Sequence, residues 1–96
     1  MAAAVTIYTT NVCPFCTRAK SLLRSKGVDF REVNVERRPE IREWLIARSK
    51  QRTVPQVFVN GAPLGGFTDI AALDQRGKLD ELLARDPEAS DPQVLD

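Results

Sequence analysis

Short β-branched and aromatic runs along the chain alternate with longer stretches in which apolar residues recur at helical spacing. The runs at residues 5–8 and 28–35 predict two strands. Between them, Pro14 suits the first turn of a helix and Gly27 suits its C-terminal end. Pro39 then opens a second helical pattern. This order of strand, helix, strand and helix predicts parallel strands joined by right-handed crossovers.

The second half of the chain predicts an antiparallel pair of strands. Residues 56–59 are mainly apolar, and Asn60-Gly61 after them is a strong signal for a tight hairpin turn. Residues 62–64 form the expected return strand. Because Pro63 has no N–H to donate to a neighbouring strand, this return strand is expected at an edge of the sheet.

One more helical segment follows before the pattern turns polar. Thr68 is expected to cap this helix, and Gly77 interrupts it. From residue 86 the chain is polar and contains prolines, which predicts a flexible tail. The sequence therefore predicts an α/β fold with a mixed four-stranded sheet flanked by helices, in β-α-β-α-β-β-α order. Residues 1–85 form the expected domain, and residues 86–96 form the tail.

Composition places this pattern in an ordinary globular chain of 96 residues, 43% hydrophobic, with a formal net charge of +1. No apolar run is long enough to cross a bilayer, and the N-terminal pattern is not that of a signal peptide. We therefore expect a cytoplasmic protein, with neither a nucleic-acid nor a membrane partner. In a reducing cytoplasm a permanent disulfide is disfavoured.

Charge is distributed unevenly along the chain. Residues 37–52 carry six bases against two acids, whereas residues 80–96 carry six acids against Arg85 alone. The basic stretch is interpreted either as a solvated helix face or as a rim that attracts anions. The second interpretation gains weight only if a site lies beside it.

Cys13 and Cys16, separated by Pro14 and Phe15, are the only cysteines. A structural zinc site needs about four ligands, and the chain offers two cysteines and no histidine. A disulfide across so short a loop contributes roughly 2 kcal/mol, against about 4.7 kcal/mol for a loop of a hundred residues. Redox chemistry benefits most from a close pair, because the second thiol is always available to resolve a mixed disulfide.

Redox chemistry requires a thiolate at neutral pH. Cys13 lies at the entrance of the predicted helix, where free N–H groups and the helix dipole favour an anion. Lowering a thiol pKa by three units requires about 4 kcal/mol, whereas the dipole supplies about 0.3–1 kcal/mol. Hydrogen bonds or a nearby cation must therefore contribute. We expect Cys13 to be the nucleophile and Cys16, one turn further on, to be the resolving thiol.

Three segments resemble the dithiol glutaredoxins of the small bacterial type, a branch of the thioredoxin fold. They are IYTTNVCPFCTRAKSLL, TVPQVFVNG and GGFTDIAAL, in the order and spacing of that family. The resemblance runs from about Val5 to Leu83. It implies a thioredoxin-like fold and thiol–disulfide oxidoreductase activity that uses glutathione as reductant.

The resemblance also implies a glutathione site. The loop Thr53-Val54-Pro55 would face the dithiol with a cis proline, and the backbone of Val54 would pair with the cysteinyl part of glutathione. The turn at residues 65–69 would hold the γ-glutamyl end, and Arg52, or less favourably Arg48, the glycyl carboxylate. The implied binding residues are Phe15, Arg52, Thr53, Val54, Pro55, Gly66, Phe67, Thr68 and Asp69.

The chain departs from the family pattern at three positions. Thr10 stands where many glutaredoxins carry a lysine that supports the thiolate. Phe15 replaces the usual tyrosine between the thiols, and Phe67 stands where a small or polar residue is more usual. A glycine-phenylalanine turn also resembles redoxins that thioredoxin reductase recharges and that serve ribonucleotide reductase.

The leading hypothesis is a monomeric enzyme that reduces protein disulfides and glutathionyl mixed disulfides with glutathione and without a metal. Three alternatives stay open. The first is the redoxin just described, and the second is a carrier in which two chains and two glutathiones ligate a [2Fe–2S] cluster through Cys13. Cys16 weighs against the carrier, because dedicated carriers usually have serine there. The third is an arsenate reductase-like protein, although the chain is short for that group.

Overall fold

The computed structural model describes residues 2–96, which form four strands and four helices. The strands are β1 (Val5–Thr9), β2 (Arg31–Asn34), β3 (Gln56–Val59) and β4 (Ala62–Gly65). The helices are α1 (Pro14–Ser25), α2 (Pro39–Ser49), α3 (Phe67–Gln75) and α4 (Lys78–Ala84). Their order confirms the predicted β-α-β-α-β-β-α arrangement, with the last helical segment divided in two.

The strands form one mixed sheet in the order β2-β1-β3-β4. β1 pairs with β2 in parallel, as expected for a crossover through α1, and pairs with β3 in antiparallel orientation. Asn60 and Gly61, both with positive φ angles of 51° and 81°, make the turn from β3 to β4. β4 lies at the edge, where the missing N–H of Pro63 costs no ladder hydrogen bond.

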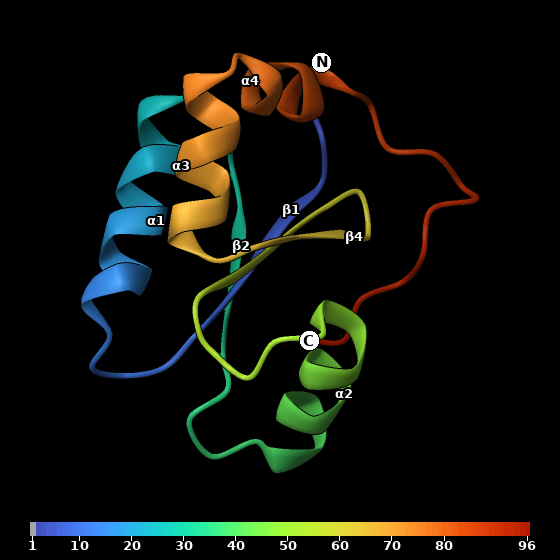
Figure 1. Cartoon of the computed structure of the whole chain (residues 1–96). Coiled ribbons are helices and arrows are strands. Elements are labelled where there is room, and N and C mark those ends of the chain that lie inside the picture. Colours follow the sequence, from blue (N-terminus) through green and yellow to red (C-terminus); the bar gives the residue numbers. More distant parts are fainter. Residues whose placement is uncertain (1) are drawn as a thin grey trace.

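The strands bury side chains on both faces of the sheet, because alternate residues point to opposite sides. Ile7 of β1 belongs to the core cluster shared with α1, α3 and α4, whereas its neighbour Tyr8 belongs to the cluster shared with α2. In β3, Val57 belongs to the first of these clusters and Phe58 to the second. Figure 1 shows α1 and α3 side by side, with α2 at the opposite side of the sheet. The result is a thioredoxin-like α/β fold.

Three details of the elements refine the sequence-based expectations. β2 is shorter than the expected strand at residues 28–35, because it pairs only with Thr6–Thr9 of β1. The expectation that Thr68 caps the third helix is wrong: α3 begins at Phe67, so Gly66 is the cap residue. Gly77, with a φ of 72°, is the left-handed residue that separates α3 from α4.

Residues 86–96 leave α4, swing outward and return beside α2 (Figure 1). Val94 packs against the core cluster on the α2 side. The division of the chain into a domain at residues 1–85 and a flexible tail stays a prediction. Among residues 2–96, no helix is both long and apolar enough to span a bilayer.

Candidate active site

The two cysteines lie at the N-terminus of α1. Cys13 is the N-cap residue, with extended backbone, and Pro14 is the first helical residue. This placement follows from the sequence, since proline is favoured at the first helical position. A disulfide joins Cys13 and Cys16, whose Cα atoms are 5.2 Å apart. Cys16 is buried, with 3% of its surface exposed, whereas Cys13 is partly exposed. Cys13 is therefore the sulfur that a second molecule reaches first.

Two backbone groups flank Cys13 Sγ. The N–H of Cys16 donates a hydrogen bond to it at 3.2 Å, which stabilises a negative charge on the sulfur. The carbonyl oxygen of Val54 lies 3.7 Å away. Neither of these groups is a cation, so the first turn of α1 is the stabilising feature that the structure provides for a Cys13 thiolate.

The loop before β3 brings Val54 to the dithiol. The peptide bond between Val54 and Pro55 is cis, as in the loop that the family resemblance implied. Gln56, fully buried at the start of β3, holds this loop from beneath: its Nε2 donates to the carbonyl oxygen of Thr53 at 3.0 Å and to Oε1 of Gln51 at 2.8 Å. Gln56 was not singled out from the sequence. A polar residue at the first position of an apolar strand was the signal available.

The turn between β4 and α3 forms the opposite wall. Gly65 has a φ of 107°, a conformation that favours glycine. A Cβ atom there would also collide with the Asp69 carboxylate, so this position requires glycine. Asp69 Oδ2 accepts a hydrogen bond from the N–H of Gly66 at 2.9 Å. The N–H groups of Phe67, Thr68 and Asp69 lie in the first turn of α3, where an anion is favoured.

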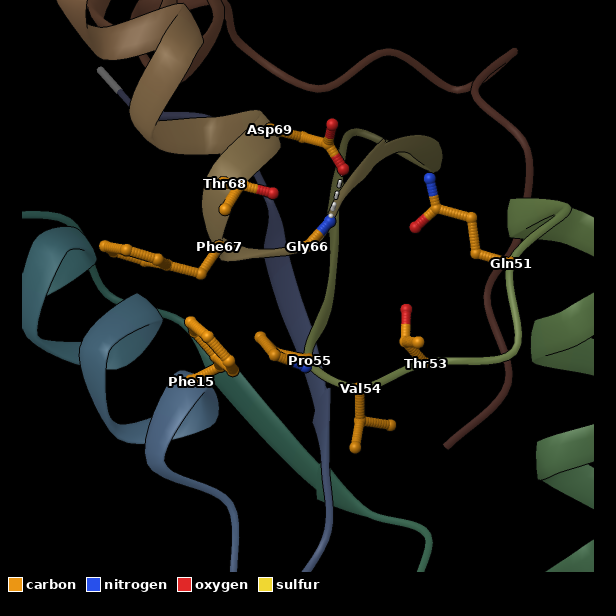
Figure 2. Close-up of a pocket in the computed structure, with 9 residues that line it drawn as sticks. All are labelled: Phe15, Gln51, Thr53, Val54, Pro55, Gly66, Phe67, Thr68 and Asp69. Carbon is orange, nitrogen blue, oxygen red and sulfur yellow. Dashed lines mark hydrogen bonds between the residues drawn. The ribbon is translucent and has the colours of Figure 1, made fainter.

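A pocket of about 460 Å³ lies between the loop and the turn. Figure 2 shows Thr53, Val54 and Pro55 along one side and Gly66 to Asp69 along the other, with Phe15 beside Pro55. Its lining residues are Phe15, Gln51, Thr53, Val54, Pro55, Gly66, Phe67, Thr68 and Asp69. Eight of these nine were expected from the sequence. The ninth, Gln51, was missed, because nothing in the sequence distinguishes it from other polar residues after α2.

Arg52 and Arg48, the two arginines expected to bind the glycyl carboxylate of glutathione, do not line the pocket. Arg52 is exposed and is not part of the pocket lining. Arg48 is turned toward the hairpin and the C-terminal residues, where it donates to the carbonyl oxygens of Gly61 and Gln93. The assignment of Arg52 to a glycyl carboxylate stays a prediction.

Two aromatic side chains border the pocket mouth. The rings of Phe15 and Phe67 have centroids 6.3 Å apart, and the guanidinium of Arg18 lies 5.2 Å from the Phe15 centroid. Phe15 is 49% exposed, and Val12 beside the dithiol is 91% exposed. The entrance to Cys13 is therefore apolar and open to solvent.

The Glutaredoxin family model matches residues 5–63, which include the dithiol, the cis-proline loop and the hairpin. The chain belongs to the glutaredoxin family. It is 51% identical over 81 residues to Glutaredoxin 3 of Escherichia coli strain K12, covering 84% of this chain and 98% of that protein. The Glutaredoxin of Pseudomonas aeruginosa is 48% identical over 80 residues, covering 83% and 95% of the two chains.

Solved glutaredoxins share the fold. The solution structure of the Brucella melitensis glutaredoxin superposes with a TM-score of 0.77 at 44% identity, covering 85% of this chain and 89% of the other. The buckwheat glutaredoxin–glutathione complex superposes with a TM-score of 0.79 at 26% identity, covering 84% and 76%. These relatives identify a small bacterial glutaredoxin of the thioredoxin-fold superfamily.

Family and geometry together establish the chemical class. Glutaredoxins are thiol–disulfide oxidoreductases, and the Cys13–Cys16 pair at a helix N-terminus supplies the dithiol that this chemistry needs. Within residues 2–96, no three His, Cys, Asp or Glu side chains gather in a group suited to a metal ion. The site is a dithiol beside a pocket with one wall formed by the cis-proline loop and one wall that presents the backbone N–H groups at the start of α3.

Proposed function

We propose that this glutaredoxin is a glutathione-dependent oxidoreductase that reduces protein disulfides and glutathionyl mixed disulfides in the cytoplasm, as a monomer. The observation that carries the proposal is the pocket beside Cys13. Its wall at Val54 comes within 3.7 Å of the Cys13 sulfur, so a ligand bound along this wall has its own sulfur next to the nucleophile.

The pocket supplies a complementary group for each part of glutathione that contacts it. The backbone of Val54 pairs with the cysteinyl residue as a short added strand. The N–H groups at the start of α3 receive the γ-glutamyl carboxylate. Asp69 already uses Oδ2 to accept from Gly66, and Oδ1 accepts from the γ-glutamyl ammonium. A buckwheat glutaredoxin has been solved in complex with glutathione, which supports this ligand.

The first chemical step is attack of the Cys13 thiolate on the substrate disulfide. A new S–S bond forms between Cys13 and one substrate sulfur, while the substrate S–S bond breaks and the other sulfur leaves as a thiolate. The N–H of Cys16, which donates to Cys13 Sγ, stabilises the attacking charge. When the substrate is a glutathionylated protein, glutathione stays on Cys13 and the protein thiol leaves.

The second step depends on which mixed disulfide has formed. For a protein substrate, Cys16 gives up its proton and attacks Cys13, which releases the reduced protein and leaves the Cys13–Cys16 disulfide seen in the structure. Two glutathione molecules then reduce this disulfide in succession and leave as oxidised glutathione. When glutathione itself is bound to Cys13, a second glutathione thiolate attacks the glutathionyl sulfur, so that Cys13 leaves as a thiolate and oxidised glutathione is released. Electrons and protons balance, since two thiols are oxidised for each disulfide reduced.

A coupled assay of NADPH consumption tests the reductant. The oxidised protein is supplied either with glutathione and glutathione reductase or with thioredoxin reductase alone. We expect turnover in the first system and little in the second. Turnover with thioredoxin reductase alone would overturn the proposal in favour of the redoxin alternative, which the aromatic turn at Phe67 favours. A mixed disulfide of glutathione with a small thiol serves as substrate, so that protein recognition does not enter the result.

A further inference from the structure

Residues 91–96 form a strap that runs across the α2 side of the sheet. The strap lies outside the residues that the Glutaredoxin family model matches. Residues 86–96 carry four acids and no base. The body beneath the strap presents Arg31, Arg38 and Arg48, and all three contact it. Arg31 meets the Asp96 carboxylate, whereas Arg38 and Arg48 donate to main-chain carbonyl oxygens of the strap.

The strap begins at the β3–β4 turn. Arg48 joins the two segments, because Nη2 donates to the carbonyl oxygen of Gly61 at 3.0 Å and Nη1 to that of Gln93 at 3.2 Å. A Cβ atom at Gly61 would collide with the carbonyl oxygen of Pro92. The turn glycine thus also allows the strap to approach the hairpin closely.

The middle of the strap covers an aromatic cluster. Val94 packs against the cluster that contains Tyr8, Trp44 and Phe58. Tyr8 is fully buried, and its hydroxyl donates to the carbonyl oxygen of Leu95. The Leu95 side chain itself is 45% exposed, so Leu95 contributes its backbone rather than its side chain.

The end of the strap lies between two arginines. Arg31 forms an ion pair with the Asp96 carboxylate, and Arg38 donates to the Asp96 carbonyl oxygen at 2.9 Å. Both members of the ion pair are more than half exposed. Exposed pairs contribute about 0.2–1 kcal/mol each, so this end is held weakly and exchanges with solvent.

These contacts have the chemistry of a peptide-binding groove. The body supplies the donors, and three of the acceptors are main-chain carbonyl oxygens, which any extended segment offers. Selectivity comes from two side chains: an apolar residue at the position of Val94 and an acid two residues later, at the position of Asp96. A segment that replaced the strap would make both side-chain contacts if it were extended and carried an apolar residue two positions before an acid.

We propose that this groove is a docking site for an extended acidic segment of a partner protein, and that the strap is its intramolecular competitor. A tethered segment has an effective concentration of about the millimolar range. A partner segment therefore binds only in proportion to the fraction of molecules whose strap is released. The proposal does not depend on glutathione, because the arginines and the tyrosine that hydrogen-bond to the strap are not among the residues that line the pocket.

Fluorescence anisotropy with a labelled peptide of residues 90–96 tests the proposal. The peptide is titrated into the full chain, into Asp96→Lys and into the double variant Val94→Asp with Asp96→Lys. We expect Asp96→Lys to bind the peptide up to about fivefold more tightly than the unaltered chain, which is the effect of one exposed ion pair. We expect the double variant to bind it at least about tenfold more tightly, because its strap no longer competes. Leu95→Ser is the matched control: it changes an exposed side chain of the strap and leaves the affinity unchanged.

Two further arms make the test decisive. A peptide with lysine in place of its final aspartate is expected to lose binding, as is Arg31→Ala introduced into the Asp96→Lys variant. Absence of peptide binding to Asp96→Lys that is folded by circular dichroism would overturn the proposal, as would equal affinity in all chains. A concentration-dependent dimer of the unaltered chain that Asp96→Lys abolishes would assign the groove to a second copy and also overturn it. Reduction of the small glutathionyl disulfide stays unchanged in every arm, which separates this result from the fate of the proposed function.

Discussion

Two cysteines three positions apart differ in their surroundings, and this difference divides their roles. Cys13 is partly exposed and accepts a hydrogen bond from the helix backbone, whereas Cys16 is buried within the first turn. A disulfide-bearing protein therefore meets Cys13 first. Cys16 reaches only a partner that is already bound to Cys13.

The division of roles predicts different effects of two serine substitutions. Cys13→Ser is expected to abolish all activity, because no nucleophile remains at the pocket. Cys16→Ser is expected to retain reduction of glutathionyl mixed disulfides and to lose reduction of protein disulfides. Parallel assays with a glutathionylated peptide and a protein disulfide measure both; an equal loss in the two variants would contradict the assignment.

Thr10 is the residue whose identity bears most on the charge of Cys13. The described polar neighbours of the sulfur are backbone groups, and the lysine common in the family is missing. Thr10→Lys is expected to increase the thiolate fraction and to speed alkylation of reduced Cys13 below neutral pH by up to about tenfold, the effect of one pKa unit. Thr10→Gln, of similar length and no charge, is the control. Equal rates in the two variants would show that charge at this position has no effect.

At the scale of elements, the site depends on the junction between β4 and α3. The carboxylate of Asp69 closes the first turn of α3 by accepting from Gly66, and it occupies the space that a side chain at Gly65 would need. The sequence GGFTD therefore specifies a turn and a ligand wall together.

Gly65→Ala is expected to displace Asp69 and to disturb the wall of N–H groups. We expect a fall of about 1 kcal/mol or more in the free energy of unfolding, and a rise in KM for the glutathionyl substrate. Gly27→Ala is the matched control, because Gly27 also has a positive φ of 71° but no atom lies within 4 Å of an added Cβ. Gly27→Ala should lower stability without changing KM. A rise in KM in both variants would mean that strain, and not contact with Asp69, is responsible.

At the scale of the whole molecule, the α2 side of the sheet is covered by one helix and by the strap. Tyr8, the only tyrosine of the chain, lies in this layer. Burial raises the pKa of Tyr8 to about 12, although the guanidinium groups of Arg48 and Arg31 act to lower it. The pH at which Tyr8 ionises therefore shows whether α2 and the strap still cover this side of the sheet.

The raised pKa of Tyr8 predicts a loss of stability at alkaline pH. The folded state keeps the phenolic proton that the unfolded chain gives up near pH 10. The contribution of Tyr8 is therefore complete below pH 10 and is lost progressively between pH 10 and about pH 12. Absorbance at the phenolate band and urea unfolding across this range measure both effects. Tyr8→Phe should remove the tyrosine-dependent part of the slope, and an identical slope in that variant would contradict the prediction.

The sequence by itself determined the order of the elements and the chemistry of the dithiol. Pro14, Gly27, Pro39 and Asn60-Gly61 act locally, through φ restriction and turn geometry, so their effects can be predicted without distant contacts. The position of Cys13 at a helix N-terminus follows from the proline beside it. The family motifs then located eight of the nine residues that line the pocket.

Only the tertiary structure decided which side chains from different segments contact one another. Buried Gln56 beneath the loop and Arg48 turned away from the pocket toward the strap are contacts that helical or strand periodicity does not predict. The strap appears in the sequence as a polar segment containing prolines, which predicts a flexible tail. Its docking depends on three arginines and a tyrosine from three different elements. A local sequence pattern cannot predict such a site, because its residues come from different elements and meet only in the folded chain.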